Sequence, residues 1–260
     1  MDGTAVDTNE GRDQGVTSEA GPGAAAGGQP AHAGAARPDA GPDAGPGGPG
    51  GPGRLGGGLD VAGAWAWVEA FHRRFSDDAA ELGELDRRAG DGDFGTNILA
   101  ALRRVRARLE QARPTTPGAV FLGVSHGFLN TGGTSGPLFG LWFRGIGRAA
   151  EGSVLTLAEL AAGVEAGTAT VQRLGKARPG DKTMVDAMVP AAAALAAAVA
   201  DGLDLPAGIA LAAEAARDGA LATEPLRARR GRASYVGDVA RGVLDPGALT
   251  VALFFDSGRG

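Results

Sequence analysis

Residues 86–97 read Asp-Arg-Arg-Ala-Gly-Asp-Gly-Asp-Phe-Gly-Thr-Asn, and the rest of the chain is organised around this stretch. Its three carboxylates fall within eight positions, and Asp91 and Asp93 are separated by a single glycine. Carboxylates this close repel one another unless a cation shares their charge. Mg²⁺ commonly takes one or two carboxylates together with phosphate oxygens. The stretch therefore favours a site for a metal ion and a phosphate.

The residues after this stretch predict a helix, because apolar side chains recur at helical spacing over residues 98–105. The loop would then lead into a helix N-terminus, where backbone N–H groups and the helix dipole favour anions. The same residues would also make an ordinary acidic helix cap with turn glycines, so the motif alone leaves this alternative open. A dinucleotide-binding loop is excluded because residues 77–88 read as helix instead of strand. An EF-hand beginning at Asp91 is excluded because Leu102 stands where a glutamate is needed.

Composition excludes several classes of protein. The 260 residues carry a net charge of -5 and no cysteine, which rules out disulfides and thiolate-based metal or catalytic sites. The mild acidity gives no support to nucleic-acid binding. The first residues lack the basic and apolar regions of a signal peptide, and the longest apolar stretch, residues 188–200, is too short to span a bilayer. We expect a soluble, cytoplasmic protein with neither a nucleic-acid nor a membrane partner.

Two regions differ in composition. Glycine and proline make up 25 of the first 58 residues, and the only large aliphatic side chains there are Val6, Val16 and Leu55. Such a segment cannot bury a core, so we predict a disordered tail, or a translation-start artefact, over residues 1–58. The pattern from residue 59 onward predicts a helical domain over 59–260.

The domain begins with an apolar stripe that predicts a helix beginning after Asp60. Ser76 or Asp77 is expected to begin a second short segment that reaches Leu85. The members of the stripe are Val61, Trp65, Val68, Phe71 and Phe75.

Further along, four polar loops rich in glycine are separated by pairs of helical segments. Helices joined by short turns pack antiparallel, so two helices return the chain to the end it left. All four loops should therefore lie at one end of a helical bundle, and the plainer turns should lie at the other. The four loops are 86–97, 131–137, 175–184 and 231–247, and the plain turns are 113–117, 151–156 and 201–206.

The motifs in these loops resemble those of the nucleotide-binding L subunit of dihydroxyacetone kinase, in the family's own order and over about residues 60–255. The resemblance implies an all-α fold, an eight-helix antiparallel up-and-down barrel with a nucleotide at one rim. The matching motifs are LDRRAGDGD at 85–93, GGTSGPLFG at 132–140, KARPGDKTM at 176–184, GRASY at 231–235 and DPGA at 245–248.

The resemblance also implies the site. Asp86, Asp91 and Asp93 would hold two Mg²⁺ ions that bridge the phosphates of ADP or ATP. Arg232 would be catalytic and would close over the nucleotide. The residues that the resemblance assigns to the nucleotide are Phe94, Gly95, Thr96, Asn97, Thr134, Ser135, Gly175, Met184, Arg232, Asp245, Pro246 and Gly247.

The function implied is phosphoryl transfer by one subunit of a dihydroxyacetone (glycerone) kinase. The family works with a separate K subunit that carries dihydroxyacetone on a histidine. Phosphate comes from ATP, or from an ADP that a phosphotransferase-system phosphocarrier protein recharges. Such a reaction depends mainly on positioning and on charge neutralisation by the metals and the arginine.

Two departures from the family pattern favour an alternative. Phe94 stands where the family has a histidine, and residues 237–243 lack an arginine, a serine and a histidine of the family's lid. The alternative is a catalytically impaired nucleotide-binding regulatory module of the same fold.

Overall fold

Helices account for nearly all of the regular structure. The computed structural model describes residues 54–55, 57–89, 92–231, 234 and 240–260, all within one unit, Gly47–Gly260. Most of the predicted tail, residues 1–58, lies outside the described residues. The helices are α1 (Val61–Ala89), α2 (Phe94–Ala112), α3 (Pro117–Leu129), α4 (Ser135–Ala149), α5 (Leu157–Gly175), α6 (Val185–Ala200), α7 (Leu205–Leu221) and α9 (Pro246–Ser257). They are preceded by a pair of two-residue antiparallel strands, β1 (Arg54–Leu55) and β2 (Gly58–Leu59).

Capping residues fix where several helices begin. The Asp60 carboxylate accepts a hydrogen bond from the Gly63 N–H, as the predicted start of the first helix requires. Thr156 forms a capping box with Glu159 at the start of α5. Asp245 caps α9 and is followed by proline at the first helical position, which confirms the predicted start of the last helix.

The prediction of two separate segments before residue 86 was wrong. α1 is one continuous helix of 29 residues. The Ser76 hydroxyl donates to the His72 carbonyl one turn back, at 2.7 Å, instead of capping a new helix. Phe75 and Leu82 are both buried on the same face, so tertiary packing holds the helix together through its polar middle.

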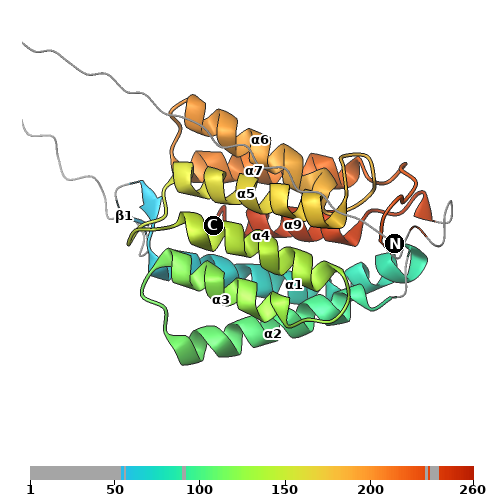
Figure 1. Cartoon of the computed structure of the whole chain (residues 1–260), viewed down its shortest axis with the longest axis horizontal. Helices are drawn as coiled ribbons and strands as arrows, with labels where there is room; N and C mark the ends of the chain where they lie inside the picture. The colour runs from blue at the N-terminus through green and yellow to red at the C-terminus, as the bar shows by residue number, and fades with distance from the viewer. Residues whose placement is uncertain (1–53, 56, 90–91, 232–233, 235–239) are drawn as a thin grey trace, which may run out of the picture. The chain divides into compact units, whose positions relative to one another are not determined.

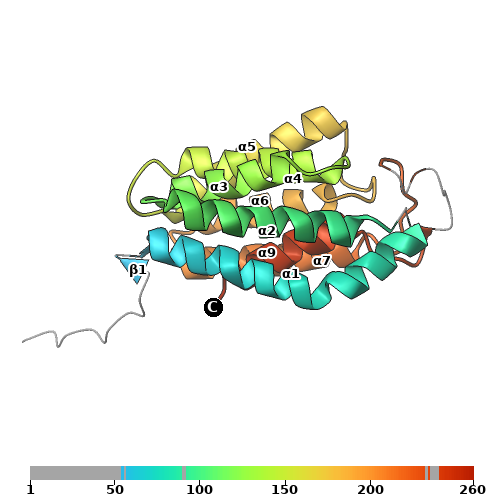
Figure 2. The same ribbon diagram turned by 90° about the horizontal axis from the view of Figure 1, so that it is seen from below.

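The helices close into a ring. Each described helix packs against the next one along the chain, and α9 packs against α1. Figures 1 and 2 show the chain running back and forth along a common direction, with β1 at one end. The predicted eight-helix antiparallel barrel is therefore confirmed for the described residues. None of the helices in this part of the chain is both long and apolar enough to cross a bilayer.

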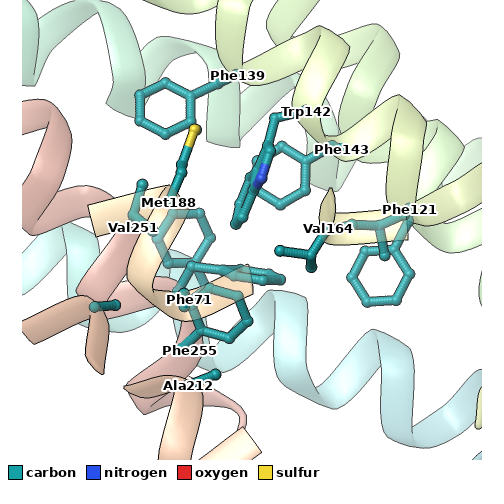
Figure 3. Packing of buried hydrophobic residues seen from close by; sticks show 14 of the residues in the cluster. Phe71, Phe121, Phe139, Trp142, Phe143, Val164, Met188, Ala212, Val251 and Phe255 are labelled. Atoms are coloured by element: carbon teal, nitrogen blue, oxygen red, sulfur yellow. The ribbon is translucent and has the colours of Figure 1, made fainter. Parts of the chain in front are cut away.

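Aromatic side chains fill the middle of the ring, and Phe254 of α9 is at their centre. Its ring stacks on Trp67 of α1, with centroids 4.6 Å apart, and meets Trp142 and Phe143 of α4 edge to face. The Trp67 indole N–H donates to the Phe254 carbonyl at 2.7 Å. Figure 3 shows Phe71, Trp142, Phe143 and Phe255 in the same cluster. These contacts join the last helix to the first and thereby close the barrel.

Glycines let α4 and α5 approach very closely. A Cβ built on Gly145 would lie 2.5 Å from the Gly163 carbonyl oxygen and 2.7 Å from the Gly167 amide nitrogen. Both neighbours are backbone atoms, so no side chain can move aside to make room. Gly145→Ala should therefore lower the free energy of unfolding by about 2–3 kcal/mol, measured by urea denaturation.

Gly152→Ala is the matched control for this substitution. Its nearest neighbour, the Val154 carbonyl oxygen, would lie 3.6 Å from the new Cβ, which is ordinary contact. If Gly145→Ala lost no more stability than Gly152→Ala, the close approach of α4 and α5 at Gly145 would not contribute to stability.

Candidate functional site

One pocket is lined by residues from all four of the polar loops, as the two-helix spacing predicts. In Figure 1 the described residues of these loops lie at the end of the barrel opposite β1. Ten of the predicted site residues line this pocket: Asp86, Phe94, Asn97, Thr134, Ser135, Gly175, Met184, Asp245, Pro246 and Gly247.

The lining does not include Gly95, Thr96 or Asp93. Gly95 is buried against α1, where an added Cβ would lie 2.9 Å from the Ala79 carbonyl oxygen. Its role in the structure is close helix packing, so the predicted ligand contact is not seen there. Thr96 is exposed and does not line the pocket either. Asp91 and Arg232 lie outside the described residues.

Four helices begin at this pocket. Its lining includes first-turn residues of α2, α4, α6 and α9, namely Phe94, Ser135, Val185 and Pro246. The first N–H groups of a helix lack partners within the helix, and the helix dipole adds partial positive charge there. Four N-termini at one cavity favour an anion with several negative groups.

Two of the predicted metal ligands flank the start of α2. One Asp86 carboxylate oxygen accepts the Phe94 N–H at 2.9 Å, and the side chain lines the pocket from the last turns of α1. Asp93 is exposed at the N-cap position of α2, and its side chain makes no capping hydrogen bond to the helix. Their oxygens suit a hard cation such as Mg²⁺. Within the described residues no group of three or more acidic or histidine side chains is close enough to hold a metal, and the third predicted ligand, Asp91, falls outside them.

Part of the pocket lining is apolar. Ile98, Leu138, Val171, Met184 and Val185 form this part of its lining. A pocket that combines apolar side chains with helix N-termini and a carboxylate suits a ligand that carries both an apolar ring and anionic groups.

Asp245 lies partly buried in the pocket wall, and its environment changes its acidity. Burial raises the pKa of the Asp245 carboxyl to about 7, and the nearby Asp186 adds to this effect. The hydrogen bond from the Ala248 N–H and the charge of Lys182 oppose it. A raised carboxyl pKa means that ionising Asp245 costs the folded protein free energy.

The raised pKa predicts that the effect of Asp245→Asn on the free energy of unfolding depends on pH. Asparagine keeps the helix cap and removes the charge. The favourable contribution of the wild-type carboxyl is fully present below about pH 4 and is lost as the pH rises to about 7. Relative to wild type, the variant should therefore gain about 2–4 kcal/mol of unfolding free energy between these two pH values. Urea denaturation of the nucleotide-free protein across this range, with a chelator present, measures the gain.

Asp204→Asn is the matched control, since Asp204 caps α7 through the same bond but is exposed. A gain of the same size and pH dependence in the control would contradict the burial argument. No gain in Asp245→Asn would contradict it equally.

Lys182 is not among the site residues predicted from the sequence, although it lines the pocket. The side chain is 2 % exposed, and burial lowers its pKa. Lys176, in the same loop, is exposed. Nothing in the local sequence separates the two lysines, because the residues that bury Lys182 come from the end of α7 and from the segment before α9.

Comparison with known proteins identifies the family. The sequence model of the DAK2 domain matches residues 88–259. The chain belongs to the DAK2 family. The match begins within the last turn of α1 and takes in every later described helix of the barrel. The resemblance found in the four loop motifs is thereby confirmed.

Relatives of this DAK2 domain cover much of its length. It is 35% identical over 187 residues to the PEP-dependent dihydroxyacetone kinase ADP-binding subunit DhaL of Escherichia coli K12, spanning 71% of this chain and 89% of that protein. It is 33% identical over 194 residues to a DhaL subunit of Listeria innocua, spanning 74% of this chain and 92% of that one. It is also 35% identical over 173 residues to human triokinase/FMN cyclase, of which it spans only 30%.

Solved structures share the fold. The dihydroxyacetone kinase of C. freundii, crystallised in its native form, superposes with a TM-score of 0.57 at 25% identity and covers 81% of this chain. The crystal structure of that enzyme in complex with AMP-PNP and Mg²⁺ superposes with a TM-score of 0.56. The DAK2 domain corresponds to 36% of each of those chains.

Proposed function

We propose that this DAK2 domain is the nucleotide-binding, phosphoryl-transferring subunit of a dihydroxyacetone kinase. The observation that carries the proposal is the convergence of four helix N-termini and the Asp86 carboxylate on one pocket with an apolar wall. A magnesium-bound adenine nucleotide combines the groups that such a pocket suits: an aromatic base, a polyphosphate and a hard cation. The similarity to two ADP-binding subunits supports the same assignment.

The proposed roles follow the lining of the pocket. Asp86, Asp91 and Asp93 would hold two Mg²⁺ ions, which when bound would neutralise phosphate charge. The hydroxyls of Thr134 and Ser135, at the start of α4, would donate to phosphate oxygens.

The remaining roles concern the base and the closure of the site. Gly175 and Met184 would border the base, next to the apolar part of the lining. Arg232 and the turn at 245–247 would close over the nucleotide, and the arginine would stabilise the charge that develops as phosphate is transferred.

We propose that the acceptor is dihydroxyacetone, or a related small ketose, held by a separate K subunit. The donor is either ATP or an ADP that a phosphocarrier protein recharges while it stays bound. A reconstituted assay tests both routes: the chain is mixed with Mg²⁺ and a K subunit loaded with dihydroxyacetone, and is given either ATP or PEP with the phosphocarrier proteins. Formation of dihydroxyacetone phosphate by either route is the expected result.

A second candidate function is a nucleotide-binding regulatory module that transfers no phosphate. The Phe94 ring favours it, because this side chain lines the pocket and cannot hydrogen-bond a phosphate. No product by either route, together with intact nucleotide binding, would support this candidate. Exchange of Phe94 for histidine, combined with the family's lid residues over 237–243, should then create activity.

A further inference from the structure

Lys182 occupies an unusual position for a lysine. Its backbone has a φ of +63°, a conformation that residues other than glycine seldom adopt. Its side chain is 2 % exposed and lines the inner wall of the pocket. Burying an ammonium group is costly unless its donors are satisfied, so the contacts of this group explain why it is tolerated.

The Lys182 ammonium bonds to backbone carbonyls from two distant segments. Nζ donates to the Thr223 carbonyl at 2.6 Å and to the Val243 carbonyl, and it lies 3.4 Å from the Glu224 carbonyl. An ammonium has three N–H donors, and these three carbonyls account for them. The ammonium donors of Lys182 are therefore engaged by protein carbonyls, although the residue lines the pocket.

Thr223 also connects the residues that follow α7 to the segment before α9. Its side chain is fully buried, and its hydroxyl donates to the Ala220 carbonyl and accepts the Asp245 N–H at 2.9 Å. One residue further on, the Glu224 carbonyl accepts the Gly242 N–H, also at 2.9 Å. We call Lys182, Thr223 and their carbonyl and amide partners the Lys182–Thr223 clamp.

The clamp holds a part of the wall that packs in a small apolar cluster of its own. Ala240 and Val243 form a small apolar cluster with Ala228, separate from the main core, and Leu85 of α1 packs against it. Two residues later, Asp245, Pro246 and Gly247 line the pocket. Polar contacts to the residues just after α7 and to Lys182 therefore add to the packing that holds this stretch.

We propose that Lys182 and Thr223 are positioning residues, which hold the segment 242–247 so that Asp245, Pro246 and Gly247 form the wall of the pocket. The consequence for nucleotide affinity rests on the proposed function. The expected effect on the order of the segment 242–247 does not rest on it, because that effect is measured in protein without nucleotide.

Thr223→Val provides the sharpest test, because it removes the hydroxyl and keeps the side-chain volume. Thr223→Ser retains the hydroxyl and is the expected rescue. Thr168→Val is the matched control, since Thr168 is also buried, its hydroxyl accepts the Trp142 indole N–H, and it is not part of the pocket lining. Lys182→Met removes the ammonium and keeps a side chain of similar length. If this variant does not fold, the Thr223 variants alone test the proposal.

Three readouts are compared across these variants: amide hydrogen exchange of Asp245 and Gly242 by NMR in the nucleotide-free protein, the dissociation constant of Mg-ADP, and the free energy of unfolding. In Thr223→Val the Asp245 amide should exchange at least about tenfold faster, and Mg-ADP should bind about tenfold more weakly. Thr223→Ser should stay within about twofold of wild type in both. Thr168→Val should lose stability without either local change.

The proposal is overturned if Thr223→Val loses only stability, with Asp245 exchange and Mg-ADP affinity as in wild type. It is also overturned if Thr168→Val changes exchange and affinity as much as Thr223→Val does. If wild-type protein does not bind Mg-ADP at all, the proposed function fails, and the exchange of the Asp245 amide alone decides whether the clamp holds the wall.

Discussion

Asp86→Asn should weaken Mg²⁺-dependent binding of ADP on the order of 100-fold, because the variant loses the charge that attracts the metal. Asparagine still offers an oxygen to the Phe94 N–H, so the start of α2 should remain in place. The affinity is measured by titrating ADP into nucleotide-free protein at saturating Mg²⁺, and the free energy of unfolding confirms that the fold is intact.

Glu84→Gln is the control for this variant. Glu84 lies half a turn earlier on α1, is exposed and pairs with Arg87. The Glu84→Gln variant should bind Mg-ADP with the affinity of the wild type. An unchanged affinity in Asp86→Asn would show that Asp86 is not a metal ligand. A loss of stability without a loss of affinity would mean that Asp86 serves only as the acceptor of the Phe94 N–H at the start of α2.

Phe254→Ala should lower the free energy of unfolding by about 4 kcal/mol, the largest effect on stability that we expect from a single substitution. The substitution leaves a cavity among Trp67, Trp142 and Phe143, where the last helix meets the first and the fourth. Urea denaturation measures the loss.

Leu211→Ala serves as its control, because Leu211 is 41% exposed on α7 and should cost less than about 1 kcal/mol. If Phe254→Ala loses no more than this control, the aromatic cluster does not hold the barrel closed. The closure would then depend on contacts elsewhere between α9 and its neighbours.

Much of the fold could be predicted from the sequence, because it depends on local signals. Helical periodicity and the spacing of the loops were enough to place four loops at one end of a bundle, and all four contribute to the pocket. Capping chemistry located the start of α9 at Asp245. The predicted break at Ser76 was wrong because tertiary packing of Phe75 and Leu82 outweighs a local capping signal.

The site was harder to predict where it depends on contacts between distant segments. Asp86 and Met184 line the pocket as expected, since each belongs to a loop motif. Gly95 serves helix packing against Ala79, which no pattern within its own loop reveals. Lys182 is buried by carbonyls about 40 to 60 residues further along the chain, so its environment cannot be read from its neighbours in sequence.

The central claim is that the pocket binds an adenine nucleotide through Mg²⁺, and calorimetric titration of the purified chain with ADP and with ATP, each with and without Mg²⁺, tests it most directly. We expect saturable binding of a nucleotide that requires Mg²⁺. A preference for ATP with rapid exchange would support a direct kinase, and ADP held too tightly to exchange would support recharging by a phosphocarrier. Absence of binding, or binding of equal strength without Mg²⁺, would contradict the claim.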